Sequence, residues 1–147
     1  MGRLFDARRF DRLEAPARRT LVRERLQPFL AHCVAESRHY GDLRSQIEPL
    51  LSELDDARFF EGFAALPPLT KDTLVRDFER VVTDPEITLA RVQGFDGEHT
   101  DGLGVLETAR GAHQVLKTSG TSGTLVYSVD RVDTIKQVMS RLLYRAL

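Results

Sequence analysis

The sequence predicts an α/β fold that is mostly helical, with a short strand–loop–strand segment near the C-terminal end. Apolar residues recur every three or four positions between Ala17 and Ser37, which is the spacing of a helix with one buried stripe. Two strand-like runs, 113–116 and 125–129, flank a segment rich in glycine and hydroxyl side chains. A helical pattern returns at Asp130 and continues to the last residue.

The composition is that of a globular protein without a membrane or nucleic-acid partner. Of the 147 residues, 41% are apolar and 29% are charged, and the net charge is −1, whereas a nucleic-acid partner favours a basic face. No apolar run approaches the roughly 20 residues that span a bilayer, and the N-terminus resembles no secretory signal. We therefore expect a cytoplasmic protein. Cys33 is the only cysteine, so a disulfide framework within one chain is excluded and a small buried residue is favoured.

The first part of the chain predicts helices. Pro28 lies within the helical pattern of 17–37 and either kinks that helix or divides it in two. A second helical pattern covers 43–54. Three phenylalanines between residues 59 and 63 favour a core cluster that joins the helices over an aromatic acyl pocket, because aromatic side chains dominate core burial. Adjacent carboxylates at Asp55 and Asp56 indicate a solvated helix face.

A further helix and then a surface loop are predicted in the middle of the chain. Thr70 is a good N-cap for a helix that reaches Val82, and Asp84-Pro85 ends it. Residues 87–92 are ambiguous. Four glycines among acidic and polar residues then predict a loop over 93–112.

His99 stands among three acidic residues in this predicted loop. A metal site can be imagined there, but a solvated loop is favoured because nothing in the spacing builds the ligand set that a metal requires. The acidic neighbours are Asp96, Glu98 and Asp101.

The last helix is predicted to begin with Asp130 as its N-cap and Asp133 in its first turn. Its pattern runs to Leu147 without a glycine or another C-cap. We expect from this ending that the chain is a truncated or split gene product.

The segment Lys117–Thr124, here called the hydroxyl–glycine run, is the strongest functional signal. Gly120 and Gly123 accept positive φ without steric cost, so the backbone N–H groups can turn inward and form a concave anion site. Hydroxyl side chains add further donors, and a polyphosphate is the natural occupant. The alternative is a hydroxyl-rich hairpin turn without a ligand. Only two residues separate the glycines and no lysine follows them, which excludes the Walker-type loop.

The run resembles the phosphate loop of the adenylate-forming (AMP-forming) ligases. Two upstream segments, 66–72 and 26–43, resemble the phenylacetate–CoA ligase branch of that family and its capsule-biosynthesis-type relatives. The resemblance covers about residues 20–147, and only the loop is specific. It implies the leading portion of the ligase N-terminal domain, with ATP and Mg²⁺ as cofactors. The residues that it assigns to the β- and γ-phosphates of ATP are Thr118, Ser119, Gly120, Thr121, Ser122 and Gly123.

This resemblance implies one truncated domain over residues 1–147. Its expected parts are a helical portion (1–92), a loop (93–112) and a strand–phosphate loop–strand–helix portion (113–147). The implied reaction activates a carboxylic acid as its acyl-adenylate and transfers the acyl group to a thiol such as coenzyme A. No catalytic or metal-ligating side chain is assigned.

Two departures from the family pattern limit what these residues are expected to do alone. Thr124-Leu125 stand where the family usually has a lysine and often a proline, and the chain ends before the family's adenine pocket, carboxylate pocket and catalytic lysine. A missing C-terminal half, or self-association through exposed apolar faces, is expected as a partner. The alternative function is a non-catalytic helical binding or scaffold protein that keeps the loop as a relic.

Overall fold

The computed structural model describes residues 10–52, 54–99, 104–118 and 125–146, with residues 140–146 described by their backbone alone. The chain divides into two compact units, Met1–Pro68 and Leu69–Leu147, where the sequence predicted a single domain. Most of the described elements are helices, and the described strands form one three-stranded antiparallel sheet. The α/β class is confirmed at this coarse level.

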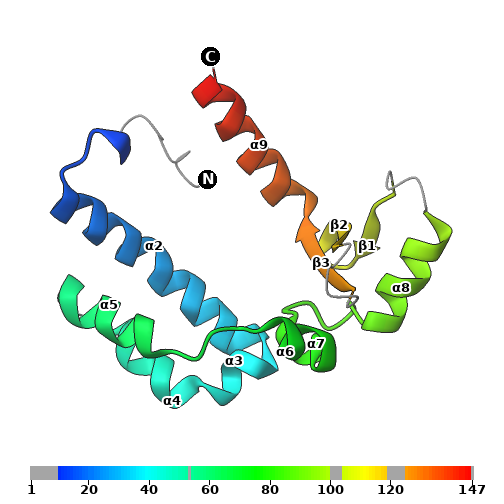
Figure 1. The fold of residues 1–147 in the computed structure, drawn as a ribbon, viewed down its shortest axis with the longest axis horizontal. Helices are drawn as coiled ribbons and strands as arrows, with labels where there is room; N and C mark the ends of the chain where they lie inside the picture. The colour runs from blue at the N-terminus through cyan, green and yellow to red at the C-terminus, as the bar shows by residue number, and fades with distance from the viewer. Residues whose placement is uncertain (1–9, 53, 100–103, 119–124, 147) are drawn as a thin grey trace. The chain divides into compact units, whose positions relative to one another are not determined.

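The first unit consists of one long helix and several short ones (Figure 1). Helix α2 passes through Pro28 without interruption, so the predicted division there is absent. Pro49 instead marks a change of helix type, because it occupies the start of a 3₁₀ turn, where its missing N–H is not needed. The elements are α2 (Ala15–Glu36), α3 (Arg38–Asp42), α4 (Arg44–Ile47), the 3₁₀ helix η1 (Glu48–Leu51) and α5 (Asp56–Ala65).

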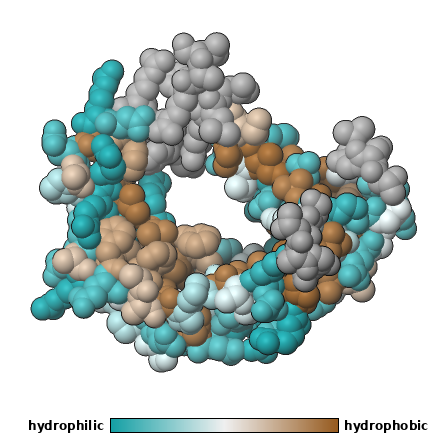
Figure 2. Space-filling view, viewed as in Figure 1, coloured by the Kyte–Doolittle hydropathy of each residue, from teal (hydrophilic) through white to brown (hydrophobic). Residues whose placement is uncertain are grey.

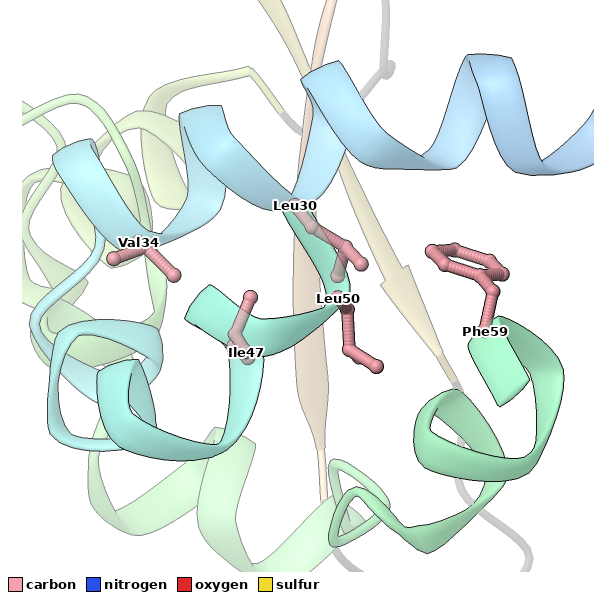
Figure 3. Packing of buried hydrophobic residues seen from close by; sticks show 5 residues of the cluster. All are labelled: Leu30, Val34, Ile47, Leu50 and Phe59. Carbon is pink, nitrogen blue, oxygen red and sulfur yellow. The ribbon is translucent and has the colours of Figure 1, made fainter. Parts of the chain in front are cut away.

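The core of the first unit lies between α2 and the short helices. Figure 3 shows its five buried side chains, Leu30, Val34, Ile47, Leu50 and Phe59. Phe59 is fully buried and Phe60 packs partly buried against the cluster, which confirms the predicted core role for these two phenylalanines. Phe63 stacks on Phe59 but is 36% exposed, so the prediction does not hold for Phe63. Cys33 is also buried, as predicted, and burial raises the pKa of its thiol.

The two adjacent carboxylates at the start of α5 differ in environment. Asp55 is the N-cap, accepting the backbone N–H of Arg58 at 2.9 Å. Asp56 accepts the Thr20 hydroxyl at 2.6 Å and the Arg23 guanidinium at 2.7 Å, and these two bonds lower the pKa of Asp56. The predicted solvated face is therefore wrong for Asp56, because α2 supplies two donors to the first turn of α5.

The second unit contains the sheet (Figure 1). Its strand order is β1-β2-β3, with both pairs antiparallel. Thr70 caps the first helix by accepting the N–H of Thr73, as predicted. The elements are α6 (Lys71–Arg76), α7 (Phe78–Val81), α8 (Leu89–Glu98), β1 (Leu106–Thr108), β2 (Gly111–Thr118), β3 (Val126–Arg131) and α9 (Val132–Ala146).

The loop predicted over 93–112 differs from the structure. The segment contains the end of α8, all of β1 and the start of β2. Helix α8 forms despite the exposed Gly94 and Gly97, because Thr88 caps the helix and Val92 is fully buried.

The core of the second unit lies between α7, α8 and one face of the sheet. Its buried members are Phe78, Ile87, Val92, Leu106 and Tyr127. Among the described helices, none combines the length and the apolar character that crossing a bilayer requires.

Helix α9 begins at Val132, one residue later than an N-cap at Asp130 predicts. Asp130 is a strand residue of β3, opposite Gln114, and its carboxylate accepts the Ser128 hydroxyl, so it is not the N-cap. Asp133 lies in the first turn, as predicted. Figure 2 shows hydrophobic residues on the described part of α9, where Val138 and Met139 are exposed.

Candidate functional site

The candidate site is the open end of the β2–β3 hairpin. Valine in both strands, and Tyr127 in β3, favour extended backbone. The last paired residues are Thr118 and Val126. The connection therefore comprises residues 119–125, which is longer than the roughly two to five residues of most hairpin loops. Thr118 is exposed at the end of β2. The other predicted phosphate ligands lie outside the described residues: Ser119, Gly120, Thr121, Ser122 and Gly123.

Lys117 is held by a carboxylate from another element. Lys117 on β2 lies directly opposite Tyr127 on β3, and side chains in such a pair share one face of the sheet. The Lys117 Nζ lies 2.9 Å from both carboxylate oxygens of Asp96 on α8, and the Tyr127 hydroxyl donates to the same carboxylate at 3.2 Å. From the sequence, Lys117 could be either a phosphate ligand or a solvated side chain; the structure pairs it with Asp96.

These three residues, here called the Asp96 cluster, are partly open to solvent. The Lys117 side chain is 51% exposed and that of Asp96 is 21% exposed, while Tyr127 is buried in the core of its unit. The carboxylate is thus the fixed member of the ion pair, and the lysine is the member that can move. Because an ammonium group carries three donors, Lys117 can bind a second anion on its solvent side.

The hydrogen bond between Lys117 and Asp96 shifts the ionisation of both groups. It lowers the pKa of Asp96 and raises the pKa of Lys117. Burial, followed by the hydrogen bond to Asp96, raises the pKa of Tyr127. At neutral pH the Asp96 cluster therefore contains a carboxylate, an ammonium group and a neutral phenol that donates its proton.

A second polar cluster of the same unit joins the linker between α7 and α8 to the β1–β2 hairpin. Asp84 and His113 are both buried, and Asp84 accepts the Thr108 hydroxyl at 2.7 Å. The His113 Nε2 lies 4.0 Å from the Asp84 carboxylate, and no group of the described residues forms a hydrogen bond with the His113 Nδ1. The Asp84 carboxylate thus connects this linker to strand β1 through the Thr108 hydroxyl.

Further bonds fix the β1–β2 turn to the same linker. The Glu86 carboxylate accepts the backbone N–H of Ala109 at 3.0 Å, and the Arg110 guanidinium donates to the Thr83 carbonyl at 3.0 Å. This arrangement is not visible in the residue pattern, where Asp84-Pro85 predicts only a helix end. An acidic residue before proline, followed by a turn rich in hydrogen-bonding side chains, is a weak signal for such a tie.

The metal site imagined around His99 is not formed by the described residues. The His99 ring stacks on Phe95 at a centroid distance of 4.2 Å, and its Nδ1 lies 3.1 Å from the Phe95 carbonyl oxygen. Within the described ranges, no group of three or more His, Cys, Asp or Glu side chains could hold a metal ion. Asp101 lies outside the described residues.

Comparisons of the chain with protein-family profiles, with curated proteins and with solved structures gave no match. The likeness to adenylate-forming ligases consequently depends on the residues of the hydroxyl–glycine run and the two upstream segments.

Proposed function

We propose that the hydroxyl–glycine run binds the triphosphate of ATP with Mg²⁺. The observation that supports this function is the composition of the run, with glycines at 120 and 123 among hydroxyl side chains, between two strands that pair directly with each other. A connection of this length can wrap around an anion, whereas a tight hairpin turn of two residues cannot.

Each residue type in the run has a physical role in this function. Glycine lets successive N–H groups point to one side, which produces a concave site of positive partial charge. Serine and threonine hydroxyls can rotate to donate to phosphate oxygens. Mg²⁺ prefers oxygen ligands and keeps several waters, so it binds mainly through the phosphates of the nucleotide.

The reaction that fits such a site is the ATP-dependent activation of a carboxylic acid in the cytoplasm. A carboxylate oxygen attacks the α-phosphorus, the bond to the bridging oxygen breaks, and pyrophosphate leaves. A thiol such as that of coenzyme A then attacks the acyl carbon and AMP leaves. The run would contribute positioning and charge stabilisation to the first step. No residue of this chain is assigned to the acid or the thiol, so nucleotide binding and not turnover is the appropriate test.

Isothermal titration with ATP and Mg²⁺ tests this proposal. We expect saturable heat for the natural chain and a loss of about tenfold or more in affinity for the double variant Gly120→Val with Gly123→Val, because N–H groups that bind charged oxygens are displaced. The matched control is Gly94→Val with Gly97→Val in α8. It has the same spacing and the same chemical change, and an added Cβ meets nothing within 4 Å at either position.

Two results would decide against ATP binding. One is the absence of heat with the natural chain, which would favour a helical binding or scaffold protein that keeps the run as a relic. The other is equal affinity in the loop variant and the control variant, which would assign the heat to a different site.

A further inference from the structure

The Asp96 cluster includes the strand pair Lys117 and Tyr127, which is one pair away from the connection between β2 and β3. Lys117 is the only lysine or arginine between Arg110 and Arg131. Because Arg131 lies at the other end of β3, opposite His113, Lys117 carries the only fixed positive side-chain charge at this end of the hairpin. Its ammonium group is already bound to Asp96 at 2.9 Å. An anion at the connection therefore meets a lysine whose charge is neutralised.

We propose that Asp96 is a positioning residue that sets the affinity of this end of the hairpin for polyphosphate by competing for the Lys117 ammonium group. This inference rests on the proposed function, since it assumes a polyphosphate at the β2–β3 connection. In the free protein Lys117 binds Asp96. In the complex its ammonium group turns toward phosphate oxygens.

The surroundings of Asp96 make this exchange feasible. Tyr127 also donates to the Asp96 carboxylate, at 3.2 Å, so Asp96 keeps one hydrogen bond when Lys117 leaves. Asp96 belongs to α8, whose residues Val92 and Phe95 pack in the core of the unit, so the carboxylate stays in place. The Lys117 side chain is the more exposed partner and has a long flexible stem.

The exchange also has an electrostatic consequence. The negative charge of Asp96 both attracts Lys117 and repels an incoming phosphate. Replacing Asp96 with asparagine removes both effects while keeping a carbonyl oxygen that can accept the Tyr127 hydroxyl. The variant should therefore bind polyphosphate more tightly, provided that Lys117 is present.

The test is a titration with inorganic tripolyphosphate at low ionic strength, where charge interactions are least screened. We expect Asp96→Asn to raise the affinity about two- to fivefold, the range that corresponds to a single partly exposed ion pair. We expect Lys117→Gln to lower the affinity, and the double variant Asp96→Asn with Lys117→Gln to bind no more tightly than Lys117→Gln alone.

Asp130→Asn is the matched control. It removes one negative charge from β3, where the Asp130 carboxylate accepts the Ser128 hydroxyl. Asp130 is three positions after Tyr127 in the strand, so its side chain lies on the opposite face of the sheet from that of Tyr127. We expect its affinity for tripolyphosphate to equal that of the natural chain. Circular dichroism of every variant verifies that the fold is retained.

The possible outcomes separate this inference from the proposed function. Equal gains from Asp96→Asn and Asp130→Asn would overturn the inference, because net charge alone would explain them. A gain from Asp96→Asn that persists without Lys117 would overturn it as well. If polyphosphate binds but ignores Asp96, the proposed function stands and the inference falls. If none of the five proteins binds tripolyphosphate or ATP, both fall.

Discussion

Asp84 connects the linker between α7 and α8 to the sheet through its ionised carboxylate. It is 5% exposed, and its carboxylate accepts the Thr108 hydroxyl at 2.7 Å and the backbone N–H of Glu86 at 3.0 Å. Burial by itself raises the pKa of Asp84. The two hydrogen bonds, together with the charges of Arg110 and His113, outweigh burial and lower the pKa below its ordinary value. The folded state therefore favours the ionised carboxylate.

We predict that Asp84→Asn destabilises the second unit at neutral pH by about 1–3 kcal/mol, because the amide has one acceptor for two donors. Since the pKa of Asp84 is lower in the folded chain than its ordinary 3.8, its ionisation stabilises the fold fully above that value. The contribution is lost as the pH falls through the folded pKa. Urea unfolding of both proteins between about pH 7 and about pH 3 measures the effect. The difference should be constant near neutrality and shrink in acid.

Thr108→Val provides a second measurement at the same site. It removes the hydroxyl donor and leaves the carboxylate, so the pKa of Asp84 should move up toward its ordinary value. Carboxyl NMR titration reads this shift directly. A stability difference between the natural chain and Asp84→Asn that widens in acid would contradict the assignment.

At the scale of elements, two glycines differ in whether the backbone requires glycine. Gly94 lies on the exposed side of α8 with no atom near an added Cβ, whereas Gly111 begins β2 with φ of +124°. An added Cβ at Gly111 meets only the Arg131 guanidinium at 3.5 Å, which is ordinary contact. The cost of a substitution there is thus in the backbone and not in a clash.

We predict opposite effects of the same substitution at these positions. Gly94→Ala should stabilise the second unit by about 0.5–1 kcal/mol, since glycine weakens a helix interior. Gly111→Ala should destabilise it by about 1–2 kcal/mol, because an L-residue is strained at this φ. Thermal unfolding of the two variants tests both signs together. A gain in stability at Gly111 would show that the turn adopts another conformation in solution.

Local patterns in the sequence predicted the elements that local forces build. The cap at Thr70, the buried stripe of α2 and the helical pattern of α9 all follow from residues close in sequence. The strand β1 does not, because Leu106–Thr108 is extended only through its pairing with β2. The end of α8 was missed for a related reason: its glycines predict a loop, and its stability comes from Thr88 and from the burial of Val92.

In the candidate site, too, only the features that depend on nearby residues could be predicted. The apolar residues predict the two strands that flank the hydroxyl–glycine run. The structure confirms both strands and shows that they pair with each other. The partner of Lys117 could not be predicted, because Asp96 is 21 residues away in sequence and lies in a segment expected to be a loop. Only the packing of α8 against the sheet brings the two side chains together.

At the scale of the whole molecule, the chain carries two hydrophobic cores that share no described residue. One contains Leu30, Ile47 and Phe59, and the other contains Phe78 and Val92. This division could not be predicted from the residues, because neither a long polar linker nor a composition change separates the units. The boundary follows Pro67-Pro68, a pair that excludes helix on steric grounds.

We predict that each core can be damaged without loss of the other. Phe59→Ala and Phe78→Ala remove the same buried side chain from α5 and α7, and each should cost about 3–5 kcal/mol in its own unit through the cavity and the lost burial. Native-state amide exchange resolves the two units. Phe59→Ala should abolish protection in α2 while the β2–β3 amides keep theirs, and Phe78→Ala should do the reverse. Equal loss of protection throughout the chain in both variants would mean that the two units unfold as one, and the nucleotide-binding tests could then not be confined to the second unit.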